Sequence, residues 1–463
     1  MVAVVGSRRL DNYMWLRAMS AFKGKVFSVQ IDENELPGIA DLGFENYRSL
    51  TEIPGPVDYV VVAVPRNVAP HILADCIRKG VGGATFFTSG FAETGTEEGR
   101  NLQGTLTRMA KEAGFKLIGP NCMGIFNPRL GVLNSADLYY GESGPVGFIS
   151  QSGTHSIFFS HVAGVNGVKI SKSVSYGNAI VLDSPDYLDY LSQDEETKYI
   201  GLYIEGVKDG RRFFEVLRRT TPRKPVVIWK GGQTEAGTRA TASHTGVLAE
   251  SQVVWEALIR QCGAVPVHSL DDMVDVMKAF VLARPTIGDR VGLMAMTGGQ
   301  SVVITDSFAK AGLEVPLLTQ KSYDELASFF NIIGGSYRNP FDMGSTVLGG
   351  SNLDLLLDIM GGDENVDTVV MELSVAFMSR RWGVSPEVLQ ALLQSLADFR
   401  ARTQKPFLVV TTAAQMEAEA LQARDRLTEY GLPAFPTFER AARALRRTVD
   451  YYRFQAETNG QGR

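Results

Sequence analysis

The sequence predicts an α/β protein built from parallel sheets. Short runs of β-branched and other apolar residues recur along the chain, each followed by glycine or small polar residues and then by a segment with helical periodicity. This order is typical of βαβ units. Within the apolar runs, polar and apolar residues do not alternate, as expected of strands buried on both faces of a sheet.

Composition narrows the class of protein. The chain has 463 residues, of which 44% are hydrophobic and 21% charged, and this length suggests about three domains. A formal net charge of -5 argues against nucleic acid or a membrane surface as the main partner. The three cysteines are scattered, and no apolar stretch approaches the roughly 18 residues of a membrane span, so no disulfide framework, thiolate metal site or membrane span is predicted. We expect a cytoplasmic protein whose partners are small molecules or another protein.

Nine apolar runs are the expected strands. They are Val2 to Val5, Val57 to Val64, Ala84 to Thr88, Val146 to Ser150, Tyr199 to Ile204, Pro225 to Lys230, Val291 to Met296, Thr368 to Met371 and Pro406 to Thr411. Two segments interrupt the pattern, residues 127–145 and residues 283–289. The sequence therefore predicts three units, at 1–126, 145–283 and 284–452.

The second and third units open alike, with GFISQSGTHS and GLMAMTGGQS, which indicates one α/β architecture used twice. The polar tail at 455–463 is expected to be disordered.

The first unit opens like a nucleotide-binding fold. A strand runs into the turn Gly6, Ser7 and Arg8, but no GxGxxG is present, so a dinucleotide dehydrogenase lacks its fingerprint. Ser89 to Glu93 and Gly119 to Gly124 follow later strands of the same sheet. They are either ordinary turns or the lining of a path for a long, thin ligand. The thiol of Cys122, in the second of these turns, has no obvious base beside it, which argues against a nucleophilic role.

In the second unit, Ser150 to Thr154 directly follow a strand and precede a helical segment. Backbone N–H groups and the positive end of the helix dipole favour an anion at such a turn. The alternative is that a Ser or Thr there only caps the helix. His155 and His161, on the same helical segment, are expected in packing or surface roles.

Two strand ends carry charged residues. Glu205 lies at the carboxyl end of YIGLYIEG, where ligands gather in open α/β sheets. Its carboxylate is either a solvated charge or a partner that orients an imidazole. Lys230 ends the next strand, and we expect a surface lysine there.

The segment Gly231 to Gly246, GGQTEAGTRATASHTG, consists almost entirely of small residues and is predicted to be a loop, with a helix beginning at about Val247. Low bulk and backbone freedom suit a segment that moves or lets phosphate approach. His244 lies near its end, and a neutral imidazole is able to attack a phosphoryl group near neutral pH. A flexible surface loop with an incidental histidine is the alternative. In the third unit, Thr297 to Ser301 and Arg338 to Asp342 are either anion-binding turns or structural loops.

Taken together, these motifs resemble the α subunits of the NDP-forming acyl-CoA synthetases, a family that includes the ADP-forming acetyl-CoA synthetases and is related to the succinyl-CoA synthetase α subunit. The resemblance covers nearly the whole chain. It rests on SGFAETG (89–95), GPNCMG (119–124), GFISQSGT (147–154), SYGNAIVLD (175–183), YIEGVKDGRRF (203–213), KPVVIWKGGQTEAGTRATASHTG (224–246) and RNPFD (338–342).

The resemblance implies a Rossmann-like CoA-binding domain followed by two flavodoxin-like ligase domains. It implies that acyl-CoA, phosphate and ADP are interconverted with the free acid, CoA and ATP through an acyl phosphate and a phosphohistidine at His244. Glu205 is then expected to orient His244, and Ser152, Gly153 and Thr154 to bind phosphate. The expected CoA contacts are Gly6, Ser7, Arg8, Val64, Pro65, Ser89, Gly90, Phe91, Asn121 and Cys122.

The resemblance also implies partners. CoA is a substrate, while ADP or ATP with Mg is expected on a separate ATP-grasp β chain, giving a hetero-oligomer, with no tightly bound metal in this chain. The first turn departs from the family pattern, since no glycine follows Gly6 before Gly24 and Arg8 and Arg9 stand there instead. The alternative function is a non-catalytic regulatory protein that binds CoA or acyl-CoA on the same fold.

Overall fold

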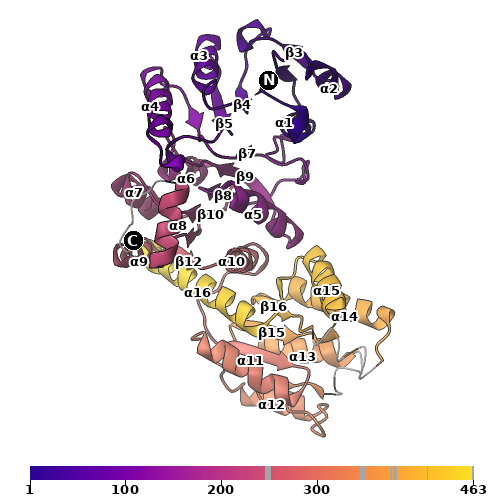
Figure 1. The fold of residues 1–463 in the computed structure, drawn as a ribbon. Helices are drawn as coiled ribbons and strands as arrows, with labels where there is room; N and C mark the ends of the chain where they lie inside the picture. The colour runs from indigo at the N-terminus through magenta and orange to yellow at the C-terminus, as the bar shows by residue number, and fades with distance from the viewer. Residues whose placement is uncertain are drawn as a thin grey trace. The chain divides into compact units, whose positions relative to one another are not determined.

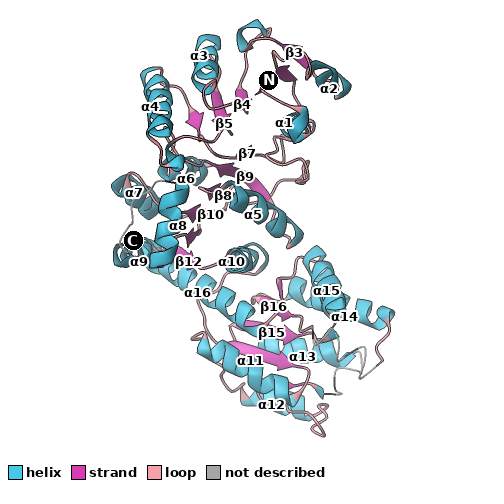
Figure 2. Ribbon diagram, in the orientation of Figure 1, coloured by secondary structure: helices cyan, strands magenta, loops and turns pink. Residues whose placement is uncertain are grey.

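The structure is a computed structural model, which describes residues 1–245, 252–344, 346, 351–375, 378, 383–413 and 416–460. The chain forms two compact units, residues 1–164 with 168–273, and residues 165–167 with 274–463. Helices and strands alternate along both (Figures 1 and 2), which confirms the α/β class. Among the described residues, no helix is long and apolar enough to cross a membrane.

The first sheet has the strand order β3-β2-β1-β4-β5-β6, with every pair parallel. In chain order this is 3-2-1-4-5-6, the Rossmann arrangement, in which ligands bind at the carboxyl ends of the strands where the order reverses. The strands are β1 Val2–Val5, β2 Val26–Val29, β3 Glu45–Tyr47, β4 Tyr59–Val62, β5 Gly83–Phe86 and β6 Leu117–Ile118. The helices are η1 Arg9–Asp11, α1 Met14–Met19, α2 Leu36–Asp41, η2 Leu50–Glu52, α3 Ala69–Lys79, η3 Ala92–Thr94 and α4 Glu97–Glu112.

The second sheet has the order β12-β11-β10-β8-β9-β7, and only β7 is antiparallel to its neighbour. The strands are β7 Gly124–Phe126, β8 Val146–Ser150, β9 Ile170–Ser175, β10 Tyr199–Ile204, β11 Val226–Lys230 and β12 Val265–Val267. The helices are α5 Gly153–Val165, α6 Ser184–Gln193, α7 Gly210–Thr220, α8 Glu235–Thr245, α9 Gln252–Cys262 and α10 Leu270–Leu282. Because β7 precedes residue 127 but pairs with β9, the second sheet recruits a strand from the expected first unit.

The third sheet is parallel throughout, in the order β14-β13-β15-β16-β17. Without β7, the second sheet has the same order, which is the flavodoxin-like 2-1-3-4-5 arrangement and confirms that one architecture recurs. The strands are β13 Val291–Ala295, β14 Phe341–Asp342, β15 Thr368–Glu372, β16 Phe407–Val410 and β17 Ala434–Phe435. The helices are α11 Gly298–Lys310, α12 Gln320–Ala327, α13 Ser351–Gly362, α14 Pro386–Arg402, α15 Glu417–Glu429 and α16 Phe438–Gly460.

The prediction of a loop over residues 231–246 was wrong, because helix α8 spans Glu235–Thr245. The Thr234 hydroxyl accepts a hydrogen bond from the backbone N–H of Gly237 at 3.0 Å and so caps the first turn. Glu235, the first residue of the helix, forms an ion pair with Arg239 one turn later. Gly246 and the expected helix start at Val247 lie outside the described residues.

The C-terminal tail also differs from the expectation of disorder, since α16 continues to Gly460. Gln455 donates a side-chain hydrogen bond to the Tyr451 hydroxyl at 3.2 Å, and the Thr458 hydroxyl donates to the Phe454 carbonyl at 2.8 Å. Contacts four residues apart therefore carry the helix into the polar segment. Residues 461–463 lie outside the described part of the chain.

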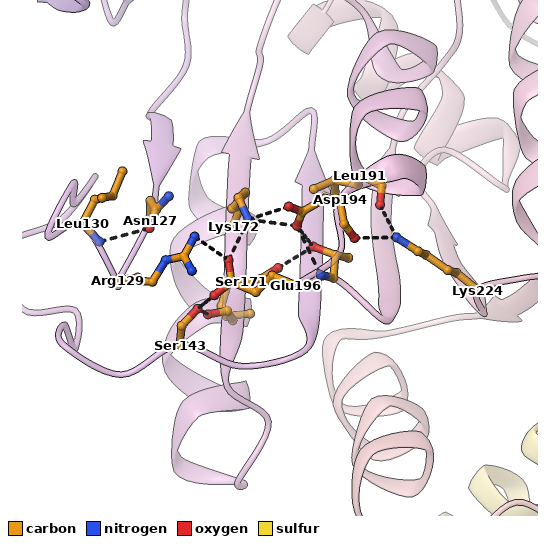
Figure 3. Close-up of polar contacts among 12 residues, drawn as sticks. Asn127, Arg129, Leu130, Ser143, Ser171, Lys172, Leu191, Asp194, Glu196 and Lys224 are labelled. Atoms are coloured by element: carbon orange, nitrogen blue, oxygen red, sulfur yellow. Dashed lines mark hydrogen bonds and ion pairs between the residues drawn. The ribbon is translucent and has the colours of Figure 1, made fainter.

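A network of ion pairs connects strand β9 of the second sheet with the loop before β10 (Figure 3). Lys172 on β9 donates hydrogen bonds of 2.8 Å to Asp194 and to Glu196, and Arg129 approaches Glu196 at 3.3 Å. Burial opposes the charge on Lys172, but the two carboxylates outweigh it and raise its pKa. The network fastens the 127–145 connection, through Arg129 and Ser143, to the loop before β10.

Candidate active site

A cavity of about 300 Å³ lies within the first compact unit, where loops that follow strands of the first and second sheets meet. Its lining residues are Phe87, Ser89, Asn121, Cys122, Met123, Gln151, Ser152, Gly153, Thr154, Ile157 and Gly177. The structure thus brings together the predicted phosphate-binding turn and three of the predicted CoA contacts, Ser89, Asn121 and Cys122.

The predicted phosphate-binding turn joins β8 directly to α5. The Ser152 hydroxyl accepts a hydrogen bond from the backbone N–H of His155 at 3.3 Å, so this serine caps the helix, as the alternative interpretation required. The capping does not exclude an anion, because the amino end of α5 faces the cavity through Gly153 and Thr154 and carries the positive end of the helix dipole. A Cβ on Gly153 would lie 2.8 Å from the Met123 side chain, so glycine keeps this wall of the cavity closely packed.

Gln151 belongs to the predicted turn Ser150 to Thr154, but no role for its side chain was predicted from the sequence. Its side-chain oxygen accepts hydrogen bonds from the backbone N–H groups of Glu205 and Gly206. Its own N–H donates to the carbonyl of Tyr203. Gln151 therefore joins the turn that lines the cavity to the end of β10, where Glu205 lies.

Glu205 is only 6% exposed, which contradicts the interpretation of a solvated charge. The Tyr203 hydroxyl donates a hydrogen bond of 3.2 Å to its carboxylate. Lys230 was expected at the surface and is instead 8% exposed, because its ammonium group donates to the carbonyls of Glu205 and Gly231 at 2.7 and 2.9 Å. Paired backbone acceptors allow this burial of a cation.

His244 lies on α8, and its side chain falls outside the described residues. Helix α8 contacts the short helix η3, which carries Glu93 and follows the Ser89 to Phe91 loop. The carrier candidate thus stands on a helix that contacts the segment directly after the Ser89 to Phe91 loop, and Ser89 lines the cavity.

His155 and His161, both on α5, have the expected packing and surface roles. The His155 ring packs 4.3 Å from the ring of Tyr203 and 4.5 Å from that of Trp229. His161 lies 3.1 Å from the carboxylate of Asp137.

The Cys122 side chain belongs to the packed wall of the cavity. It is 3% exposed, and its sulfur donates a long hydrogen bond of 3.7 Å to the Phe86 carbonyl. Burial raises the pKa of its thiol to about 12, so the thiolate is scarce at neutral pH. This agrees with the argument against a nucleophilic cysteine.

The remaining predicted CoA contacts lie at the carboxyl ends of the first sheet, outside the cavity lining. Gly6 has a positive φ of 88°, and a Cβ there would lie 2.7 Å from the Ala63 carbonyl, so only glycine fits beside β4. Ser7 is buried, while Arg8 is exposed. Val64 and Pro65 follow β4, and Gly90 and Phe91 follow β5.

In the second compact unit, both candidate turns have structural roles. Thr297 caps α11 by accepting from the N–H of Gln300. The Asn339 side chain accepts from the N–H of Leu293 and donates to the Val291 and Pro316 carbonyls. The described residues contain no group of three or more His, Cys, Asp or Glu side chains placed to hold a metal ion.

Three more lining residues, Phe87, Ile157 and Gly177, were not singled out as site residues from the sequence, whereas Met123 belongs to the predicted turn Gly119 to Gly124. Gly177 stands in the motif SYGNAIVLD, where the pair Gly177 and Asn178 was the available signal of a turn. Phe87 and Ile157 look like ordinary apolar residues in sequence, so nothing marked them.

Comparisons with known proteins agree with this arrangement. Residues 1–128 match the model of a CoA binding domain, and residues 143–280 match that of a succinyl-CoA ligase like flavodoxin domain. The α subunit of acetate–CoA ligase [ADP-forming] II from Pyrococcus furiosus is 35% identical, with 100% of this chain and 97% of the relative covered. The α subunit of acetate–CoA ligase [ADP-forming] I from the same organism is 32% identical, with 98% and 97% covered.

Among solved structures, the dinucleotide-forming acetyl-coenzyme A synthetase 1 of Ca. Korarchaeum cryptofilum, in complex with phosphate and ADP, superposes with a TM-score of 0.84 at 30% identity. The match covers 99% of this chain and 97% of that one. With this likeness over its full length in both sequence and structure, the chain belongs to the family of the α subunits of ADP-forming acetate–CoA ligases.

Proposed function

We propose that the chain is the α subunit of an ADP-forming acyl-CoA synthetase, which interconverts acyl-CoA, phosphate and ADP with the free acid, CoA and ATP. The observation that carries this proposal is the shared cavity, where the amino end of α5 meets Asn121 and Ser89 from the first sheet. A phosphate at the helix end would lie beside a thioester held by the Rossmann-like domain.

The proposed reaction gives each of these groups a role. A phosphate oxygen held by Ser152, Gly153 and Thr154 attacks the thioester carbonyl, the carbon–sulfur bond breaks, and CoA leaves as the thiol. The product is an acyl phosphate. The neutral imidazole of His244 then attacks its phosphorus, and the free acid leaves, which makes phosphohistidine. Glu205 accepts a hydrogen bond from the other imidazole N–H and fixes the nucleophilic tautomer.

The remaining parts of the proposal concern domains and partners. Residues 1–126 bind CoA, residues 145–283 form the ligase domain with the carrier histidine, and residues 284–452 form a second ligase domain. One sheet in each range supports this division, although β7, at Gly124–Phe126, pairs within the second sheet. The α-subunit names of the relatives point to a second chain. We assign to that chain an ATP-grasp fold and the site for ADP or ATP with Mg.

The test is transfer of labelled inorganic phosphate to the purified chain in the presence of a panel of acyl-CoAs, with His244→Asn as the control. We expect a label that is acid-labile, stable in base and absent from the variant, and the acyl-CoA that gives most label identifies the acid. If neither this chain nor its complex with a candidate β chain and ATP takes up label while CoA still binds, the proposal is wrong.

A further inference from the structure

Asn178 lies in the loop between β9 and α6, is 5% exposed, and forms hydrogen bonds with side chains of three other segments. Its side-chain nitrogen donates to the carboxylate of Glu93 at 2.6 Å and to the side-chain oxygen of Gln103 at 3.0 Å. Its side-chain oxygen lies 3.4 Å from the donating amide nitrogen of Asn121. One residue of the second sheet's loops thereby contacts two segments that follow strands of the first sheet, and helix α4.

The bond to Glu93 reaches the backbone of the loop after β5. The other carboxylate oxygen of Glu93 accepts from the N–H groups of Gly90 and Phe91, at 2.6 and 3.1 Å. Hydrogen bonds to a charged group are shorter and stronger than those between neutral groups. Asn178 therefore fixes the carboxylate that in turn fixes the conformation of the Ser89 to Phe91 loop.

The backbone of Asn178 is also fixed by hydrogen bonds, so its side chain has a defined direction. Its N–H donates to the Pro120 carbonyl at 3.0 Å, and the N–H of Ile180 donates to the Gly119 carbonyl at 3.1 Å. On the other side, the Lys208 ammonium group donates to the carbonyls of Asn178 and Ala179, at 2.8 and 2.7 Å. The loop thus lies on the turn that carries Asn121.

We infer that Asn178 is a positioning residue for acyl transfer, an inference that rests on the proposed function. It keeps Ser89 and Asn121, on the first sheet's side of the cavity, at a fixed distance from the proposed phosphate-binding turn on the second sheet's side. A shift of about 1 Å between reacting groups is enough to slow a reaction about 100-fold. The same bridge holds η3, and with it the surface that helix α8 contacts.

The experiment exchanges the amide of Asn178 and the carboxylate of Glu93, which are hydrogen-bond partners. Asn178→Asp sets a carboxylate against Glu93, and Asn178→Asp with Glu93→Gln restores a donor and an acceptor in reversed positions. Asn101→Asp, an exposed asparagine on α4, is the matched control. Each variant is assayed for single-turnover labelling by phosphate with saturating acyl-CoA, for acyl-CoA affinity, and for deuterium uptake of peptides covering residues 87–95.

We expect Asn178→Asp to label about 100-fold more slowly, with little change in acyl-CoA affinity, and to take up deuterium faster over residues 87–95. The reciprocal double variant is expected to regain most of the rate and the protection, and Asn101→Asp to match the wild type. A wild type that labels while Asn178→Asp labels equally fast, or a double variant no better than the single one, overturns the inference. A wild type that takes no label defeats the proposed function first, and the inference with it, whatever the exchange data show.

Discussion

The side-chain oxygen of Gln151 accepts a hydrogen bond of 2.8 Å from the backbone N–H of Glu205 and one of 3.2 Å from that of Gly206. Both donors are buried. A glutamine in the proposed phosphate-binding turn thus sets the backbone position of the residue proposed to orient the carrier histidine. The relationship would link the two proposed catalytic steps, attack by phosphate and transfer to imidazole, through one side chain.

Replacing Gln151 by Ala is expected to lower the free energy of unfolding by about 1–3 kcal/mol, because two buried N–H groups lose their acceptor. Urea denaturation measures the change. Gln193→Ala, which truncates an exposed glutamine on α6, is the control and should alter stability by less than about 0.5 kcal/mol. Equal stability of the two variants would show that the Gln151 bonds are not important for folding.

Replacing Lys172 by Met is expected to destabilise the fold by about 3 kcal/mol, because it leaves Asp194 and Glu196 without their shared cation. The three side chains are 12%, 16% and 20% exposed, so solvent screens the interaction only in part. Lys198→Met serves as the comparison, because it removes an exposed lysine directly before β10. A difference between the two variants of less than 1 kcal/mol would contradict this account.

The same network predicts a pH dependence. Burial favours protonation of Asp194 and Glu196, but their bonds to Lys172 outweigh it and lower the pKa of both carboxyl groups. A lowered pKa in the folded state stabilises the fold fully above the unfolded pKa of about 4, and this contribution is lost as the pH falls through the folded pKa. The stability gap between wild type and Lys172→Met should therefore be widest above pH ~5 and narrow steadily in acid. Denaturation from pH 7 to pH 3 measures it, and a gap independent of pH would refute it.

The three cysteines are expected to be inert in the native protein. All are buried, and burial raises the pKa of Cys76 and Cys122 to about 12 and of Cys262 to about 11. Alkylation by iodoacetamide at pH 8 should proceed at least about 100-fold more slowly than in urea, since both thiolate fraction and access are low. Mass spectrometry of the alkylated peptides measures this for each thiol. Rapid native labelling at Cys122 would revive the question of its reactivity.

Gly177→Ala is expected to damage both fold and activity. Gly177 has a φ of 52°, and a Cβ would lie 2.3 Å from the Asn121 carbonyl oxygen and 2.4 Å from that of Pro120. Gly80→Ala is the matched control, because Gly80 has a φ of 71° with nothing within 4 Å of its Cβ, so it incurs only the backbone strain of about 1–2 kcal/mol. The excess loss of stability and labelling in Gly177→Ala measures the close approach of the two loops. Similar losses in both variants would mean that the contact relaxes freely.

The central strands could be predicted from sequence because continuous apolar runs are visible without context. The bounds of β1, β8 and β10 agree with the prediction to the residue. Edge strands such as β3 and β14, with three and two residues, are too short to show a pattern. Helix α8 was missed because small residues were interpreted as loop formers, although alanine favours helices and Thr234 supplies a cap.

The site was predictable in part, because some of its turns are visible in the sequence without knowledge of the fold. Turns after strands are recognisable one at a time, and the turns that carry Ser89, Asn121 and Ser152 were found in this way, whereas the CoA contacts expected of Ser89 and Asn121 came from the family resemblance. Their meeting in one cavity, and the burial of Lys230 over two carbonyls, depend on contacts between residues far apart in sequence. Only the folded chain shows those contacts.

Helix α8 is also much shorter than the same residues would be in an extended conformation. Its 11 residues span about 16 Å as a helix, at 1.5 Å per residue, whereas the same residues in extended form reach about 36 Å. Its glycine and three threonines lower the free energy needed to unwind it, compared with an all-alanine helix. A melting transition in this one segment would therefore extend the reach of His244 by about 20 Å without moving any sheet.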